Sequence, residues 1–478
     1  MVFEQIESAL HPRSIAIAGA SDNPLSMGYH FLHYLIDYGY PGDIYPINHN
    51  RRLISGLRTY PTLREVPGPI DYVICCLPAS RVLDFLEDCP QKKVKTIQLF
   101  TARLSETGDK DAILLENQIL KKAIEFGIRL IGPNCMGIYH PKMGIYFGYD
   151  LPEESGPVGM FFQSGGVSAG FIRYASLQGV RFSKVISFGN GLDFNESDYL
   201  EYFTQDPETK VIASYIEGTK DGRRFLKTLR QATPLKPVIV LKSGRSKAGI
   251  RTASSHTAAL AGSQNIWESG MRQAGAIQAR TLEEMIDLVV SFYFLPPIFG
   301  RNVGIVGGSG GRGVISADEW EEAGFRVIPL PPEIRKLVKE VSPELWWKWI
   351  ENPIDMSMLP DYALKRNFLK LMMENPSFDF IVANLDTDAP LGKDEMINHF
   401  KGDIDDIVEI KNKSKKPLIA VLSTGSLGID DFKSWRWRLI AEQKTRLVDN
   451  RIPVYPSLSQ AASALNHLVE YYQRKETR

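Results

Sequence analysis

The sequence of 478 residues contains only four cysteines. They have no paired metal-ligand spacing, and a chain this long with four cysteines does not indicate a disulfide framework. Cys75 and Cys76 lie inside an apolar run, where buried thiols are expected. The sequence therefore predicts neither a metal site nor a fold held by disulfides, and a reducing cytoplasm fits it best.

The chain also lacks long apolar runs and an excess of charge of either sign. No stretch of about 18 apolar residues is present. Glu4 and Glu7 interrupt the first residues, so these do not resemble a signal peptide. Lys plus Arg and Asp plus Glu each number 56. We therefore expect no membrane span and no broad nucleic-acid surface, although a local basic pocket is compatible with zero net charge.

A standard Gly-x-Gly-x-x-Gly dinucleotide fingerprint is also missing. Gly19 and Gly28 are too widely spaced for it, and Asn48 stands near the place of the usual acidic ribose ligand. This pattern weighs against a dinucleotide-dependent oxidoreductase, a class that a test of NADH binding would settle.

What the sequence does contain is an alternation of short apolar runs and helical patterns, which indicates doubly wound parallel sheets. Its length favours about three domains. We expect these at residues 1–150, 151–298 and 299–478, with the last boundary in the Pro-containing segment 295–300. The first and third domains are expected to open with a strand and a glycine turn, in the stretches 14–21 and 303–311. The other expected strands are 43–47, 72–77, 96–100, 129–131, 158–162, 185–188, 211–215, 237–241, 275–278, 326–328, 380–384, 417–422 and 453–455.

Turns after the first two expected strands are suited to an anion. Gly19 and Ser21 lie where backbone N–H groups would point outward at a helix start. Asn48 follows the second strand, and Arg51 and Arg52 behind it suit either a 3′-phosphorylated ribose or a pyrophosphate. We expect Arg51 to read the 3′-phosphate; a solvated basic turn is the alternative.

A similar turn opens the second domain. Ser164, Gly165 and Gly166 follow its first strand and begin an apolar helix, whose dipole and free N–H groups favour a phosphate or a phosphorylated side chain. Simple turn chemistry is the alternative. It is the favoured interpretation for the related segment 307–311, because no catalytic-looking residue follows that turn.

One histidine has unusual surroundings. His256 lies in the small, hydroxylated run 254–262, after the Gly- and Ser-containing loop 242–249. Unprotonated imidazole is a good nucleophile near neutral pH, and small neighbours let it approach a substrate. The segment therefore predicts a histidine that accepts and carries a phosphoryl group. Glu217, at another strand end, is suited to orient such an imidazole, with a surface glutamate as the alternative.

An ordered set of short motifs resembles the α subunit of the ADP-forming acyl-CoA synthetases and, over the first two domains, that of succinyl-CoA synthetase. Each motif alone is weak, but together they span essentially the whole chain. One departure is His49, where the family usually has proline. The motifs lie at 14–21, 45–48, 77–79, 105–108, 132–135, 163–165, 188–190, 215–218, 241–245 and 255–257, with 352–355 and 456–462 in the extra C-terminal domain.

The resemblance implies an α/β fold: a CoA-binding Rossmann-like domain followed by two flavodoxin-like doubly wound parallel-sheet domains. It implies that His256 is the phosphorylated histidine, that Glu217 stabilises it, and that Ser164, Gly165 and Gly166 hold the phosphate. CoA contacts are expected at Gly19, Ser21, Asn48, Arg51, Pro78, Glu106 and Asn134.

The resemblance also implies an acid–CoA ligase that interconverts acyl-CoA, ADP and phosphate with carboxylic acid, CoA and ATP through acyl phosphate and phospho-His256. We expect no ATP-grasp segment in this chain. ADP or ATP with Mg is therefore expected on a separate ATP-grasp β subunit, in a hetero-oligomer. A non-catalytic CoA or acyl-CoA sensor of the same fold is the alternative, which the presence of His256 and Glu217 disfavours.

Overall fold

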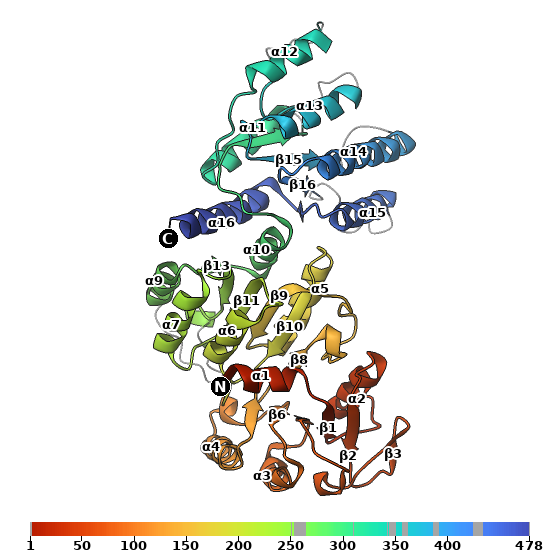
Figure 1. The fold of residues 1–478 in the computed structure, drawn as a ribbon, viewed down its shortest axis with the longest axis vertical. Helices are drawn as coiled ribbons and strands as arrows, with labels where there is room; N and C mark the ends of the chain where they lie inside the picture. The colour runs from red at the N-terminus through yellow and green to blue at the C-terminus, as the bar shows by residue number, and fades with distance from the viewer. Residues whose placement is uncertain are drawn as a thin grey trace. The chain divides into compact units, whose positions relative to one another are not determined.

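A computed structural model gives the fold of the chain (Figure 1). The structure describes residues 2–249, 251–252, 264–308, 310–341, 343, 350–355, 362–385, 392–423 and 434–477. The chain divides into two compact units, Met1–Met285 and Ile286–Arg478, which are described separately below.

The first sheet of unit 1 is fully parallel, with the strand order β2–β1–β5–β6–β7. Every residue of β1, β5 and β6 is buried, because helices cover both faces. The strands are β1 (Ser14–Ala18), β2 (Asp43–Ile47), β5 (Tyr72–Cys75), β6 (Thr96–Leu99) and β7 (Arg129–Ile131). The helices are α2 (Met27–Asp37), α3 (Val82–Leu86) and α4 (Lys110–Glu125), with a small hairpin of β3 (Leu53–Ile54) and β4 (Leu57–Arg58) after β2.

The second sheet of unit 1 has the order β13–β12–β11–β9–β10–β8, parallel except at the edge strand β8. Its strands are β8 (Gly137–Tyr139), β9 (Ser155–Phe162), β10 (Phe182–Ser187), β11 (Val211–Ile216), β12 (Val238–Lys242) and β13 (Ile277–Ala279). Its helices are α5 (Gly165–Ser176), α6 (Glu196–Gln205), α7 (Gly222–Ala232) and α9 (Gln264–Ala274); α10 (Leu282–Phe294) runs across the division between the units.

Helix α1 (Val2–Leu10) and strand β8 were not expected from the sequence. Helix α1 buries Ile6, Ala9 and Leu10 and packs against α6, whose Tyr202 hydroxyl donates to Glu7 over 2.5 Å. Strand β8 lies within the range 1–150, yet it pairs with β10 of the second sheet. The first residues are thus part of the core of this unit, and a strand from the range 1–150 forms one edge of the second sheet.

Unit 2 contains one parallel sheet, and its described strands follow chain order, β14–β15–β16–β17. They are β14 (Val303–Val306), β15 (Phe380–Leu385), β16 (Leu418–Leu422) and β17 (Val454–Tyr455). The helices around them are α11 (Gly310–Glu322), α12 (Pro332–Val341), α13 (Tyr362–Glu374), α14 (Lys393–Lys413), α15 (Trp435–Asp449) and α16 (Leu458–Glu476).

Unit 1 also contains short 3-10 turns. These are η1 (Leu63–Glu65), η2 (Ala79–Arg81), η3 (Pro90–Lys92), η4 (Ser105–Thr107) and η5 (Pro141–Met143).

The prediction of parallel α/β sheets is confirmed, but the expected strand at 326–328 is wrong. Only Arg326 pairs there, in an isolated bridge with Asn302. The next amide, that of Val327, donates to the Glu321 side chain over 2.7 Å instead of to a neighbouring strand. Once a side chain accepts that hydrogen bond, the ladder has no donor with which to continue. Among the helices of the described residues, none combines the length and the apolar character that a membrane span requires.

A buried charge cluster stabilises the second sheet. The Lys184 ammonium, on β10, is 3.0 Å from both carboxylate oxygens of Asp206 and 2.7 Å from Glu208. The side chains of Lys184 and Asp206 are 2% and 3% exposed. Glu208 also binds the more exposed Lys142, and these hydrogen bonds from Lys142 and Lys184 lower the pKa of Glu208 to about 2.

We expect Lys184→Met to lower the free energy of unfolding by about 3–5 kcal/mol, because it leaves the Asp206 carboxylate buried without its cation. Lys142→Met is the matched control: the Lys142 side chain is 55% exposed, so we expect a loss of at most about 1 kcal/mol. Urea denaturation measures both losses, and hydrogen exchange assigns the transition to unit 1. Equal losses for the two variants would contradict the buried-charge argument.

Candidate functional site

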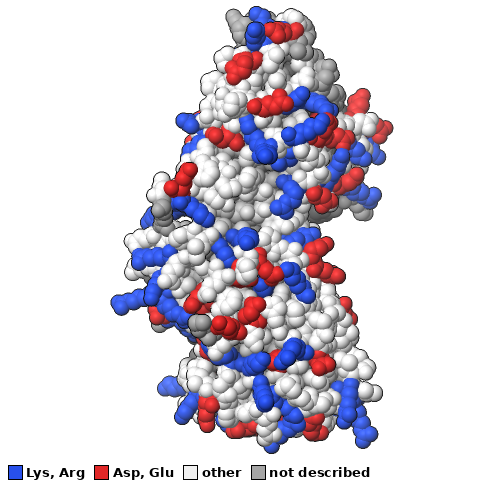
Figure 2. All heavy atoms as spheres, in the orientation of Figure 1, with Lys and Arg blue, Asp and Glu red and all other residues white. Residues whose placement is uncertain are grey.

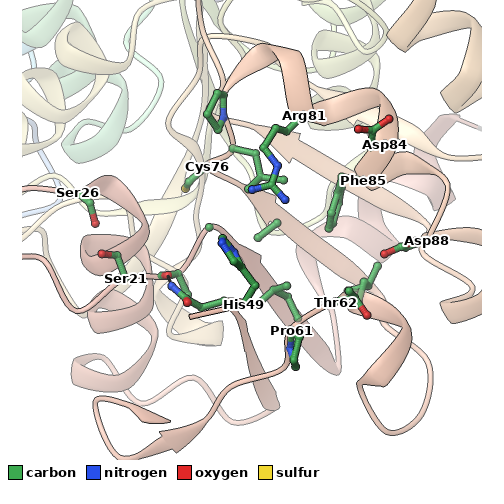
Figure 3. Close-up of a pocket in the computed structure, with 18 residues that line it drawn as sticks. Ser21, Ser26, His49, Pro61, Thr62, Cys76, Arg81, Asp84, Phe85 and Asp88 are labelled. Atoms are coloured by element: carbon green, nitrogen blue, oxygen red, sulfur yellow. Dashed lines mark hydrogen bonds between the residues drawn. The ribbon is translucent and has the colours of Figure 1, made fainter. Parts of the chain in front are cut away.

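A cavity of about 420 Å³ opens at the carboxyl edge of the first sheet (Figure 3). It lies at the ends of β1, β2 and β5, where the strand order reverses on either side of β1. Open parallel sheets bind ligands at such a switch point. The cavity is lined by Ala18, Gly19, Ala20, Ser21, Ser26, Ile47, Asn48, His49, Pro61, Thr62, Leu63, Cys76, Leu77, Pro78, Arg81, Asp84, Phe85 and Asp88.

The turn after β1 is shaped by close packing. Gly19 has φ +88°, and a Cβ there would lie 3.2 Å from the Cys76 carbonyl oxygen. A Cβ on Gly28, in the first turn of α2, would lie 2.0 Å from the Gly19 carbonyl oxygen. Helix α2 can therefore begin directly over the turn only because both positions are glycine. The Asn48 amide donates to the Ala20 carbonyl over 2.8 Å and ties the end of β2 to the same turn.

The expected CoA contacts fall into two groups. Gly19, Ser21, Asn48 and Pro78 all line the cavity. The other three do not line it. The Arg51 guanidinium lies 3.0 Å from the Asp22 carboxylate, beside Ser21, and both side chains are at least half exposed.

Glu106 and Asn134 lie where the first sheet meets the second. Glu106, in η4 after β6, accepts a hydrogen bond of 2.8 Å from the amide of Asn190, which follows β10. Asn134 has φ +55°, and its N–H donates to the Thr101 carbonyl over 2.9 Å. Gly189 packs against this turn so closely that a Cβ would lie 2.1 Å from the Pro133 carbonyl oxygen. Glu106, Asn134, Gly189 and Asn190 thus form a line of contacts between the carboxyl edges of the two sheets, which we call the seam.

The second sheet also has a switch point at its carboxyl edge, between β9 and β11. Ser164 is the N-cap of α5, and its hydroxyl accepts a hydrogen bond of 3.4 Å from the Val167 amide. A Cβ on Gly165 would lie 2.3 Å from the Met136 side chain, whereas Gly166 is exposed and has open space around it. The first turn of α5 is therefore closed on one side by Met136 and open on the other, where its N–H groups can meet an anion.

Glu217 lies beside this helix start, at the end of β11, which pairs with β9. It is only 4% exposed, so the interpretation as a surface glutamate is wrong. The Tyr215 hydroxyl donates to its carboxylate over 3.3 Å. The backbone of Glu217 is held by Gln163, whose side-chain oxygen accepts the N–H groups of both Glu217 and Gly218.

Lys242, at the end of the neighbouring β12, completes this arrangement. Its ammonium donates to the Glu217 carbonyl over 2.6 Å and also to the Ser243 carbonyl. Burial lowers the pKa of Lys242, while the nearby Glu217 carboxylate opposes that shift. Sequence reasoning assigned no role to Gln163 or Lys242. In the sequence only their positions could have indicated a role, since Gln163 directly precedes Ser164 and Lys242 ends its strand.

His256 lies outside the described residues, as does the whole run 254–262. Its proximity to Glu217 therefore stays a prediction. The part that the structure does bring together consists of Ser164, Gly165 and Gly166 on α5 and the buried Glu217 on β11.

A cavity at the switch point of one parallel sheet, followed by a second parallel sheet with an anion-suited helix start, is the architecture of an α/β protein that binds phosphate-containing ligands. Residues 13–141 match a CoA binding domain, and residues 155–292 match a succinyl-CoA ligase like flavodoxin domain. The chain is 33% identical to the acetate–CoA ligase [ADP-forming] II subunit alpha of Pyrococcus furiosus over 96% of each chain. The chain thus belongs to the family of ADP-forming acyl-CoA synthetase α subunits, which are ligases.

Two further comparisons extend over nearly the whole chain. A solved structure of the Ca. Korarchaeum cryptofilum dinucleotide forming acetyl-coenzyme A synthetase 1, in complex with phosphate and ADP, is similar with a TM-score of 0.81 and 30% identity, covering 99% of this chain and 97% of that one. The 4-hydroxybutyrate–CoA ligase [ADP-forming] of Nitrosopumilus maritimus is 31% identical over 97% of this chain but only 64% of its own length.

Proposed function

We propose that this chain carries the CoA and phosphoryl-transfer sites of an acid–CoA ligase. The reaction interconverts acyl-CoA, ADP and phosphate with a carboxylic acid, CoA and ATP. The observation that carries the proposal is the burial of Glu217 beside the start of α5. A buried carboxylate next to an anion-suited helix start can orient an imidazole while the helix holds the phosphoryl group.

The proposed chemistry has three steps. Phosphate attacks the thioester carbonyl of acyl-CoA, so the carbon–sulfur bond breaks and acyl phosphate and CoA form. An imidazole nitrogen of His256 then attacks phosphorus, and the carboxylate leaves. Phospho-His256 finally transfers the phosphoryl group to ADP. The covalent intermediate lets the acyl and nucleotide sites remain apart, because the histidine carries the phosphoryl group between them.

The residues divide between the two sheet edges. CoA is placed in the cavity at Gly19, Ser21, Asn48 and Pro78, with Arg51 at its rim. Glu106 and Asn134 lie on the seam that leads toward the second sheet, which suits the thioester end of CoA. The inorganic phosphate is placed at Ser164, Gly165 and Gly166. In this proposal, domains 1–150, 151–298 and 299–478 supply the CoA site, the phosphohistidine segment and a C-terminal flavodoxin-like domain.

The nucleotide is assigned to a partner, an ATP-grasp β subunit that binds ADP or ATP with Mg. Support comes from the relative in Nitrosopumilus maritimus, only 64% of whose length is covered, whereas the match to the Pyrococcus furiosus α subunit covers 96% of each chain. Acidic and basic side chains are interspersed on the face shown in Figure 2, in keeping with small acidic ligands rather than with nucleic acid. A cytoplasmic hetero-oligomer remains the expectation.

Reconstitution tests this proposal. We expect the purified chain to bind CoA but to bind ADP–Mg only weakly, and to form no ATP from acetyl-CoA, ADP and phosphate. Addition of an ATP-grasp subunit should start ATP formation, measured by luminescence, because phospho-His256 then meets its acceptor. ATP formation by the chain alone, at a rate proportional to its purity, would contradict the division between subunits. Binding of CoA without turnover in the reconstituted complex would favour a sensor.

A further inference from the structure

One basic side chain, that of Arg81, lines the cavity of the first sheet, and the sequence analysis assigned no role to it. Arg81 ends η2, between β5 and α3, and among the described residues that line the cavity it is the only lysine or arginine. Its backbone N–H donates to the Pro78 carbonyl over 2.9 Å, which fixes the start of the side chain. Its guanidinium forms no ion pair or hydrogen bond with any residue in the described part of the chain.

The side chain of Arg81 is directed into the cavity. Figure 3 shows the guanidinium pointing toward His49, which follows β2 on the opposite wall. In the same view Phe85 lies between Arg81 and Asp88, one of the two aspartates that line the cavity. Asp88 is already paired, because the Arg64 guanidinium lies 2.6 Å from its carboxylate. The charge of Arg81 is therefore available to a ligand.

Arg51 differs from Arg81 in each of these respects. It does not line the cavity, and its guanidinium pairs with Asp22 next to the glycine turn. At a switch point the pyrophosphate of a nucleotide faces such a turn and the helix N-terminus, and the ribose extends toward the end of the second strand. By this geometry Arg51 stands near the pyrophosphate, whereas Arg81 and His49 flank the ribose.

We propose that Arg81, rather than Arg51, reads the ribose 3′-phosphate of CoA and so distinguishes CoA from nucleotides that lack a 3′-phosphate. The planar guanidinium can donate two parallel hydrogen bonds to one phosphate, and it exchanges no existing protein contact for them. The inference rests on the proposed CoA site. It makes Arg81 a specificity residue and leaves Arg51 as a general contact for the diphosphate.

Calorimetric titration with CoA and dephospho-CoA tests the assignment on the wild-type chain and on Arg81→Ala, Arg81→Lys and Arg51→Ala. We expect Arg81→Ala to weaken CoA binding about 10- to 100-fold and dephospho-CoA binding less than about threefold. Arg81→Lys should fall between, because it keeps the charge without the planar fork. Arg51→Ala should weaken both ligands by the same factor.

The outcomes separate the two levels of the proposal. If Arg51→Ala is the selective variant, or if Arg81→Ala affects both ligands equally or neither, the assignment of Arg81 is wrong although the CoA site stands. If the wild-type chain binds neither ligand, the proposed CoA site itself is wrong. Thermal unfolding of each variant shows whether a loss of affinity reflects loss of fold; Arg81 is exposed, so we expect unchanged midpoints.

Discussion

Replacing His256 by asparagine is expected to reduce ATP formation by the reconstituted enzyme more than about a thousandfold. Asparagine retains hydrogen-bonding capacity but has no nucleophilic ring nitrogen, so the phosphoryl group has no carrier between acyl phosphate and ADP. Incubation of the wild-type enzyme with acetyl-CoA and radioactive phosphate should label this chain with an acid-labile, base-stable group. The variant should show no label, while its affinity for CoA, which depends on the first sheet, should be unchanged.

His11→Asn is a suitable control for this experiment. His11 directly follows α1, and its side chain is 39% exposed. Its imidazole interacts with Glu7, and its ring packs edge-to-face against His140 with the ring centroids 5.0 Å apart. We expect the control to be labelled and to turn over at the wild-type rate. Residual turnover by His256→Asn within tenfold of wild type would refute the assignment of the phosphorylated histidine.

Substitution of Glu217 by glutamine is expected to lower kcat by about 10²–10³-fold. Glutamine has nearly the same shape and can still accept the hydrogen bond from Tyr215, so the clamp by Gln163 and Lys242 on the backbone should persist. What is lost is the negative charge that orients and stabilises the imidazole. The amount of phosphate label at steady state should therefore fall, with the KM for acyl-CoA nearly unchanged.

Glu201→Gln removes the same charge from an exposed position on α6, where the Glu201 side chain is 47% exposed, and should leave kcat unchanged. A fall in thermal stability of Glu217→Gln that matched its loss of activity would identify Glu217 as a structural residue. A loss of label with an unchanged unfolding midpoint would support the role at the phosphohistidine.

The sheet strands could be predicted from the sequence because each is a short apolar run buried on both faces. The bounds of β2 and β7 agree with those expected, and most other strands differ by a few residues. Local sequence carries little signal for an element whose register depends on distant partners. Strand β8 has three residues and is held by β10, and Arg326 is limited to one bridge because the next amide donates to Glu321.

In the candidate sites, too, some features follow from the local sequence and others only from the tertiary structure. By itself the sequence determined the positions of the turns at Gly19 and Ser164, since glycine and an N-cap residue directly after an apolar run have local physical causes. The tertiary structure alone decided that β11 lies beside β9, and thus that Glu217 is buried next to α5. It also decided that Arg81, and not Arg51, faces the cavity. Strand order determines which side chains meet at a sheet edge, and that order results from packing across the whole domain.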